Sequence, residues 1–289
     1  MKIVSYIFEP VAIKNLVAHL SLLERRLPIE TIVIIYNKKL TLHEVKCHFI
    51  FLDRAIKCIF YDYDGKNWEF GAYQLGIEKA VKQGDDLIIM NDTFGRHYPF
   101  FKSDLNRFVA NIDIAKVSQI PQVVGKVEGK GIPFYLCGYE FDSWIRSNLF
   151  YLNAAALTCL KFRIFDGSVF HAPVVKDKNF SLGISASDRL QHYLESWMSC
   201  DPQNGGWLAH SGHKKVSDAL RRDKTGSILL EKLVSARILS AEGKLLNYAL
   251  DNSAFIYQAR IRAFFRIRRI KRLLNMSLQQ ILKIKAEFV

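Results

Sequence analysis

Residues 67–95 read NWEFGAYQLGIEKAVKQGDDLIIMNDTFG, which joins a polar turn to a helical segment and a short apolar run. Asn67 is of a residue type that caps helices, so we expect the helix to begin beside it. Small and apolar residues then recur at helical spacing: Ala72, Leu75, Gly76 and Ala80. This pattern predicts a narrow helical face that packs closely on a neighbouring element.

The apolar run that follows predicts a buried strand. Gly84 is expected to end the helix, and Leu87–Met90 is a short, fully apolar segment typical of a parallel sheet. Asn91 and Asp92 come directly after it, and we expect them at the rim of the sheet, outside the core. In an open α/β sheet, ligands bind outside the carboxyl ends of the strands. The two polar residues are therefore candidates for ligand contacts.

The segments around this stretch alternate between strand and helix patterns. Runs rich in β-branched and aromatic residues predict strands at residues 2–8, 31–36, 48–52 and 57–63. Apolar residues at helical spacing predict a helix at residues 11–26. This alternation predicts an α/β fold with a mostly parallel central sheet flanked by helices. The composition changes near residue 214, so we expect one domain at 1–213 and a helical basic C-terminal appendage at 214–289.

Two short motifs resemble a known family. EFGAYQLG at residues 69–76 and NDT at residues 91–93 are similar to motifs of the rhamnan-synthesis-type glycosyltransferases of bacterial polysaccharide clusters, which are GT-A enzymes. The resemblance implies a GT-A-like, Rossmann-like fold. It also implies an inverting, hexosyl-type transfer from a nucleotide-sugar donor to a saccharide or lipid-linked saccharide. The product would belong to capsule, O-antigen or lipopolysaccharide chains.

The resemblance further implies a donor site at the carboxyl ends of the strands. Its residues would be Tyr36, Asn37, Asn67, Gly71, Asn91 and Asp92. These residues also have structural alternatives. The Tyr-Asn pair can be a plain boundary between strand and turn, Gly71 can serve helix–sheet packing, and Asp92 can form a turn after its strand.

Glycosyl transfer requires neutralisation of a diphosphate leaving group, which Mg²⁺ or Mn²⁺ on carboxylate oxygens usually provides. Asp92 is the best candidate ligand, and the resemblance adds His210 as a further metal or phosphate contact. The second aspartate of the family motif is absent, because Thr93 and Phe94 follow Asp92. We therefore expect a divalent metal ion at Asp92, but the missing second aspartate leaves open whether a metal is required. His210 can equally be a solvent-exposed loop residue.

The acceptor hydroxyl must also lose a proton to a base. The resemblance places an acid near a helix that begins at Ser187 or Asp188. Glu195 is the first candidate for the base and Asp188 the second. Both can instead belong to a solvated helix face or a cap.

The C-terminal part of the chain carries a basic amphipathic pattern. Residues 256–274 contain no acidic residue, and their arginines and lysines alternate with apolar side chains. Such a pattern suits the surface of an anionic membrane. The residues expected at that surface are Arg262, Phe264, Phe265, Arg266 and Arg269. The alternatives are a helix packed on the catalytic domain with its basic face in solvent, or a nucleic-acid surface.

The formal net charge of +13 favours anionic partners but does not choose among nucleic acid, lipid and phosphorylated substrates. The five cysteines are scattered without metal-ligand spacing, and no signal pattern opens the sequence. We therefore expect a cytoplasmic protein, peripheral on the inner face of the plasma membrane. The alternative function is a non-enzymatic basic α/β protein that binds nucleic acid or anionic membrane. No helix-turn-helix, RNP-like or zinc pattern favours nucleic acid.

Overall fold

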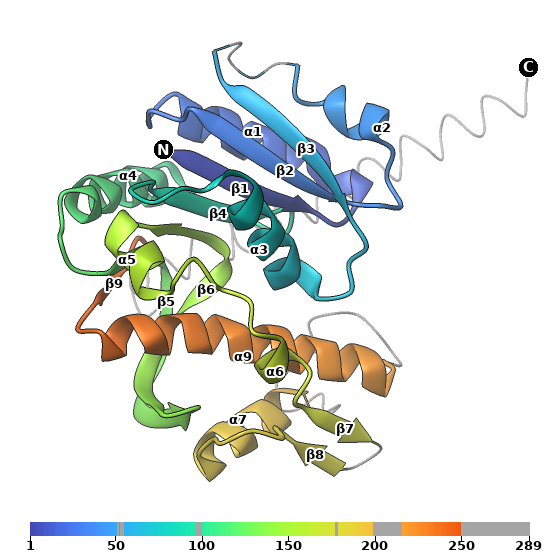
Figure 1. Ribbon diagram of the computed structural model, residues 1–289, viewed down its shortest axis with the longest axis vertical. Coiled ribbons are helices and arrows are strands. Elements are labelled where there is room, and N and C mark those ends of the chain that lie inside the picture. Colours follow the sequence, from blue (N-terminus) through green and yellow to red (C-terminus); the bar gives the residue numbers. More distant parts are fainter. Residues whose placement is uncertain (51, 53–54, 96–99, 177–178, 199–215, 250–289) are drawn as a thin grey trace, which may run out of the picture.

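A seven-stranded sheet forms the centre of the molecule, with helices on both of its faces (Figure 1). The computed structural model describes residues 1–50, 52, 55–95, 100–176, 179–198 and 216–249. The strands of the sheet are β1 (Lys2–Ile7), β2 (Thr31–Asn37), β3 (Lys57–Tyr63), β4 (Leu87–Asn91), β5 (Gln122–Leu136), β6 (Tyr139–Leu152) and β9 (Lys244–Asn247). A separate hairpin pairs β7 (Val174–Lys176) with β8 (Asn179–Ser181).

The strand order in the sheet is β3-β2-β1-β4-β6-β5-β9. Strands β3, β2, β1 and β4 run parallel to one another, and β9 runs parallel to β5. Strand β6 is antiparallel to both of its neighbours, β4 and β5. The predicted α/β fold with a mostly parallel central sheet is confirmed.

The helices divide between the two faces of the sheet. One face carries α1 (Ile13–Glu24) and α4 (Lys102–Lys116). The other face carries α3 (Trp68–Ala80), α5 (Ala154–Cys159), α6 (Gly167–Phe170), α7 (Asp188–Met198) and α9 (Asp218–Ser240). The short helices η1 (Pro10–Ala12) and α2 (Leu42–Lys46) follow β1 and β2.

Alternating side chains of the strands contribute to two cores. In β1, Val4 and Tyr6 belong to the core on the α3 side, whereas Ile3 and Ile7 belong to the core on the α1 side. Every residue of β4 is buried because both faces of this strand are covered. That burial explains why its sequence is a continuous apolar run.

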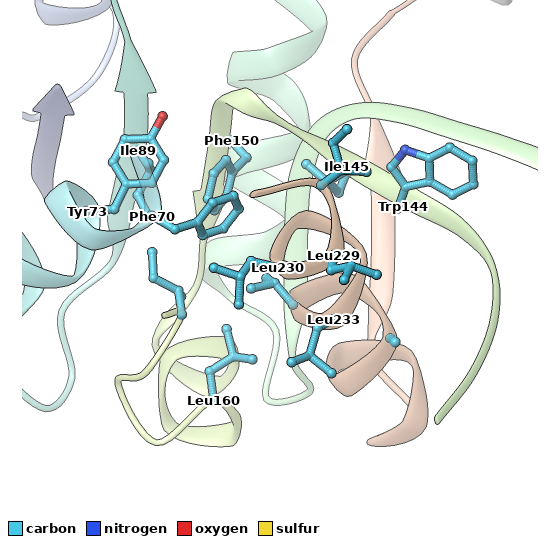
Figure 2. Packing of buried hydrophobic residues seen from close by; sticks show 14 of the residues in the cluster. Phe70, Tyr73, Ile89, Trp144, Ile145, Phe150, Leu160, Leu229, Leu230 and Leu233 are labelled. Atoms are coloured by element: carbon cyan, nitrogen blue, oxygen red, sulfur yellow. The ribbon is translucent and has the colours of Figure 1, made fainter. Parts of the chain in front are cut away.

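The larger core joins the sheet to α9. Figure 2 shows Leu229, Leu230 and Leu233 of α9 in the same cluster as Phe70 of α3 and Phe150 of β6. Strand β9, which follows α9, pairs with β5 in the central sheet. The boundary expected after residue 213 therefore does not separate two cores, because α9 and β9 belong to the fold of the preceding residues.

Helix α3 and strand β4 form where the sequence predicts them, with differences at the helix ends. A Cβ added at Gly76 would collide with Val4 of β1, so the close packing of this face is confirmed. Asn67 precedes α3, but its side chain makes no capping hydrogen bond. The helix already ends at Ala80, and Gly84 lies in the following turn with a φ of 86°. Gly84 thus serves the turn, where its left-handed backbone is easily adopted.

The strand expected at residues 48–52 is wrong. Helix α2 ends at Lys46, just before this segment, and residues 47–50 follow it as a turn. A capping box starts this helix: Thr41 Oγ1 accepts a hydrogen bond from the Glu44 backbone N–H (3.2 Å), and Glu44 Oε2 accepts one from the Thr41 backbone N–H (2.7 Å). This local start signal determines the structure more strongly than the short apolar run that follows.

Within the described part of the chain, no helix has the length and apolar character needed to cross a membrane. The expected membrane-surface residues lie outside the described residues: Arg262, Phe264, Phe265, Arg266 and Arg269. Their role at an anionic membrane stays a prediction.

Candidate functional site

The order of the strands reverses between β1 and β4. The chain leaves β1 for β2 on one side of it and returns later to β4 on the other side. At such a point the connections after two neighbouring strands diverge, and ligands bind outside the carboxyl ends of those strands. The register pairs Tyr6 with Asn91, so Phe8 and Asp92 extend beyond the last pair. We call this region the switch-point edge.

Asp92 is buried at this edge. The residue is 2% exposed, and its Oδ2 accepts hydrogen bonds from the backbone N–H groups of Phe8 (2.7 Å) and Glu9 (2.8 Å). The backbone N–H of Asp92 donates to the carbonyl oxygen of Tyr6 (3.0 Å). Asp92 therefore ties the end of β4 to the turn after β1, and the expectation that it stands outside the core is wrong. Its contact with a donor stays a prediction.

Asn91 forms the turn that leaves β4. Its Oδ1 accepts hydrogen bonds from the backbone N–H (3.1 Å) and the hydroxyl (2.6 Å) of Thr93. This arrangement is an Asx turn, which the sequence suggested as the alternative for the neighbouring Asp92. The side chain of Asn91 is buried and its oxygen is engaged within the protein. Donor binding by Asn91 stays a prediction.

Two tyrosines line the α3 side of the edge. The rings of Tyr6 and Tyr63 pack edge to face, with centroids 6.0 Å apart. Tyr6 is 3% exposed, and its hydroxyl has no hydrogen-bond partner among the described residues. Burial is the main reason that the pKa of Tyr6 is raised well above its ordinary value. The negative charges that Tyr63 and Asp92 carry when ionised raise it further. The Tyr6 hydroxyl is thus a neutral donor at physiological pH.

The space beside Gly71 is filled by Tyr63. A Cβ added at Gly71 would collide with the Tyr63 hydroxyl and with Asn67. That hydroxyl accepts a hydrogen bond from the Asn67 backbone N–H at 3.2 Å, and burial raises the pKa of Tyr63 to about 12. The close approach that Gly71 permits is therefore made by a tyrosine of β3. Contact between Gly71 and a nucleotide stays a prediction.

Tyr36 and Asn37 lie on opposite faces of the sheet. Tyr36 belongs to the core on the α1 side, whereas Ile35, the residue directly before it, belongs to the core on the α3 side. Side chains alternate along a strand, so Asn37 follows Ile35 onto the α3 face. The Asn37 Oδ1 accepts a hydrogen bond from the Lys39 backbone N–H at 3.0 Å. Only Asn37 of the predicted pair therefore shares a face with Tyr6.

A carboxylate of α3 connects three elements at the switch-point edge. Glu69 Oε1 accepts hydrogen bonds from the hydroxyls of Ser147 on β6 and Ser227 on α9, each at 3.1 Å. Glu231 Oε2, also on α9, accepts a hydrogen bond from the Ser147 backbone N–H at 2.8 Å. The pairing of β6 with β4 begins at Leu149, and Ser147 lies two residues before it in the sequence. We call these four residues the Glu69 cluster.

Sequence reasoning assigned no role to the Glu69 cluster. Glu69 lies inside the EFGAYQLG motif, so its acidic side chain beside a predicted strand end was a usable signal. Ser227 and Glu231 carried no such signal, because they stand in an ordinary amphipathic helical segment. Packing of α9 on β6 and α3 brings them to the edge.

A buried lysine lies next to this cluster. Lys232 is 1% exposed, and its Nζ lies 3.6 Å from the centre of the Trp144 ring. Burial lowers the pKa of Lys232 to about 8, against the attraction of the Glu231 carboxylate. Burial also raises the pKa of Glu231 above its ordinary value. The charged forms of Lys232 and Glu231 are therefore both destabilised by the loss of contact with water.

We expect the free energy of unfolding to rise with pH because of Lys232. Its folded pKa of about 8 lies below the ordinary value of 10.5, so between these values the unfolded chain binds more protons than the folded chain. The cost of burying the charge is full below pH 8 and fades toward pH 10.5. Urea unfolding across this range should show wild type gaining stability relative to Lys232→Met. In the control Lys116→Met, at an exposed site, the free energy of unfolding should change with pH as it does in wild type. The same pH dependence in Lys232→Met and wild type would contradict the prediction.

The two predicted bases lie on α7. Asp188 opens this helix and is exposed, and Glu195 is half-buried. Tyr193 of the same helix packs on Trp144, with ring centroids 5.9 Å apart. A residue two positions further along a helix points toward the opposite side, so Glu195 faces away from this contact. In the described part of the chain, no hydrogen bond or ion pair joins either acid to Glu69.

The described residues do not build a metal centre. No group of three or more His, Cys, Asp or Glu side chains among them could hold a metal ion. Asp92 uses its Oδ2 for two backbone donors, and His210 lies outside the described residues. The metal role of Asp92 and His210 stays a prediction.

Comparisons with known proteins give only distant structural likenesses. No protein-family model and no curated protein sequence matches the chain. HddC from Yersinia pseudotuberculosis is similar over 54% of this chain and 77% of its own, with 11% identity and a TM-score of 0.34, both alone and complexed with GMP-PN. Mannose-6-phosphate isomerase from Helicobacter pylori is similar over 61% of this chain and 82% of its own, with 14% identity and a TM-score of 0.35. Likenesses at this level assign no function.

Proposed function

We propose that the chain is an inverting glycosyltransferase that moves a sugar from a nucleotide-sugar donor to a saccharide or lipid-linked saccharide. The observation that carries the proposal is the Tyr6 hydroxyl at the switch-point edge, which is buried and has no hydrogen-bond partner among the described residues. Buried polar groups are normally paired. A hydroxyl or phosphate oxygen of a bound donor would supply the partner.

The groups around Tyr6 suit such a donor. Phe8 extends from the end of β1 and is 54% exposed, with its ring centroid 6.4 Å from that of Tyr6. An exposed aromatic ring beside a ligand edge can stack on a nucleobase or a sugar face. At the start of α3, the Lys224 Nζ lies 5.3 Å from the centre of the Trp68 ring. This ammonium group supports neutralisation of a diphosphate at the same edge.

Glu69 is the base in this proposal. Two serine hydroxyls fix its carboxylate at the edge, where an acceptor hydroxyl would meet the donor. The acceptor hydroxyl gives its proton to Glu69 while its oxygen bonds to the anomeric carbon of the sugar. The bond between that carbon and the diphosphate oxygen breaks, and the diphosphate leaves with the electron pair. Attack from the face opposite the leaving group inverts the anomeric configuration.

Thermal unfolding with a panel of nucleoside diphosphates, each with and without Mn²⁺, tests donor binding. A nucleotide that binds only the folded chain raises the unfolding temperature in proportion to its saturation. We expect at least one nucleoside diphosphate to stabilise the protein at millimolar concentration. Stabilisation by none of them, together with salt-sensitive binding of duplex DNA, would favour the alternative of a non-enzymatic basic protein.

Glu69→Gln is expected to lower the transfer rate about 100-fold or more, because a carboxamide cannot take the proton of the acceptor. The amide oxygen can still accept hydrogen bonds from Ser147 and Ser227, so nucleotide binding and unfolding should stay close to wild type. Glu78→Gln on the exposed side of the same helix is the matched control. Glu195→Gln and Asp188→Asn test the bases predicted from the sequence. Loss of turnover in either of these, with full turnover in Glu69→Gln, would refute the assignment of Glu69.

The proposed setting of the reaction rests on the sequence. Cell-surface polysaccharide synthesis, including capsule and O-antigen, is what the family resemblance implies. A peripheral position on the cytoplasmic face of the membrane rests on the basic pattern of residues 256–274. Both therefore belong to the proposal, and the donor sugar is set by contacts that residue patterns do not resolve.

A further inference from the structure

A cavity of about 570 Å³ lies between the turn after α5, the start of α6 and the last turns of α9. Its volume is in the range of small-molecule sites. Its lining shares no residue with the Glu69 cluster or with the tyrosines of the switch-point edge. The lining includes Tyr139, Lys161, Arg163, Phe165, Asp166 and Arg237.

Positive charge dominates the lining. Lys161, Arg163 and Arg237 line the cavity together with one carboxylate, that of Asp166. The Asp166 Oδ2 accepts from an Arg237 guanidinium nitrogen at 3.1 Å, and its Oδ1 accepts from the Ser168 backbone N–H (3.1 Å) and hydroxyl (2.6 Å). Asp166 thus holds the Arg237 guanidinium in place at the wall of the cavity. Lys161 and Arg163 are exposed, and no carboxylate among the described residues forms an ion pair with either.

The turn that carries these two cations is held in an unusual conformation. Lys161 and Phe162 both have left-handed backbones, with φ values of 52° and 57°. Non-glycine residues adopt this region at a cost, and they persist in it where the surroundings enforce it. Gln74 of α3 enforces it here: its Nε2 donates to the Phe162 carbonyl (3.1 Å), and its Oε1 accepts from the backbone N–H of Ile164 (3.0 Å). The positions of Lys161 and Arg163 are therefore built into the fold.

We infer that this cavity binds a small phosphate ester. Guanidinium and ammonium groups that line one cavity match the charge and the several oxygens of a phosphate group. The aromatic residues Tyr139 and Phe165 add apolar surface for the ring of a sugar or nucleoside. Arg237 is paired with Asp166, but a partner without charge would leave Lys161 and Arg163 without a carboxylate or phosphate to neutralise them. An anionic group is therefore the ligand that the lining favours.

Isothermal titration of the full chain with inorganic phosphate and with glucose 1-phosphate at low salt tests this inference. We expect both to bind wild type, with glucose 1-phosphate the tighter because it also contacts the rings. Lys161→Gln/Arg163→Gln should weaken both affinities about 10-fold or more. Lys14→Gln/Lys116→Gln removes the same charge from exposed positions outside the cavity and should leave both affinities within about twofold of wild type.

A second variant separates geometry from charge. Gln74→Met keeps every cation but removes the hydrogen bonds that hold the turn, so it should weaken binding of glucose 1-phosphate while net charge is unchanged. Equal affinities in the two double variants, or no binding of either phosphate to wild type at millimolar concentration, would overturn the inference. Glu69→Gln should bind both phosphates as wild type does, so this test stands apart from the test of glycosyl transfer.

Discussion

Asp92→Ala should lower the free energy of unfolding by about 3 kcal/mol and abolish nucleotide binding. The carboxylate is buried and accepts two backbone hydrogen bonds, from Phe8 and Glu9. Removing it leaves both N–H groups unpaired, and hydrogen bonds to a charged acceptor are worth about 1.5–3 kcal/mol each. The turn after β1 would then lose its link to β4, and the switch-point edge would lose its shape. Urea unfolding and the nucleotide thermal shift measure the two effects.

Asp92→Asn is the informative partner of this variant. An asparagine keeps one oxygen that can accept from the same backbone groups, so we expect it to retain most of the stability. Asp113→Ala, at an exposed position of α4, is the control for loss of a carboxylate at the surface. Wild-type stability in Asp92→Ala would show that the two N–H groups find other partners, and it would remove the structural role assigned to this residue.

Gly226→Ala should lower the free energy of unfolding. A Cβ at this position of α9 would collide with the carbonyl oxygen of Phe170 at the end of α6, and a backbone atom cannot move aside as a side chain can. Overpacking of this kind costs up to about 3 kcal/mol, and alanine returns about 1 kcal/mol through its higher helix propensity. The expected net loss is about 2 kcal/mol. It would also displace Ser227 from Glu69 and reduce transfer.

Gly167→Ala is the matched control for Gly226→Ala. A Cβ at Gly167 would lie 3.7 Å from the nearest atom, a ring carbon of Phe165, which is an ordinary contact. Because Gly167 is the first residue of α6, alanine should leave stability unchanged or raise it slightly. Equal urea midpoints for both substitutions would show that α9 moves away from α6 at little cost.

The sequence predicts the parts of the fold that are specified locally. Helix α3 and strand β4 follow from helical spacing and from a continuous apolar run, and both signals lie within a few residues of their consequences. The parallel sheet follows from the alternation of such segments. The start of α2 is also specified locally, by Thr41 and Glu44, but the apolar run beside it resembles a strand.

The candidate site was less accessible because its members meet only through packing. Asp92 stands where the sequence places it, but its two backbone partners belong to the end of β1, so its burial was not predictable from its neighbours. Tyr36 and Asn37 are adjacent in sequence and separated by the pleat of the strand. Ser227 lies 158 residues from Glu69, and no local pattern marks that meeting.

Strand β9 has a consequence for biosynthesis. It pairs in parallel with β5, with Gln122 opposite Lys244, so more than a third of the chain is synthesised between the two partners. Until β9 leaves the ribosome, the outer side of β5 presents unpaired backbone groups to other nascent chains. Expression yield should therefore depend on chaperones that shield the unpaired side of β5. Truncation before Lys244 should increase the fraction of the product found in inclusion bodies.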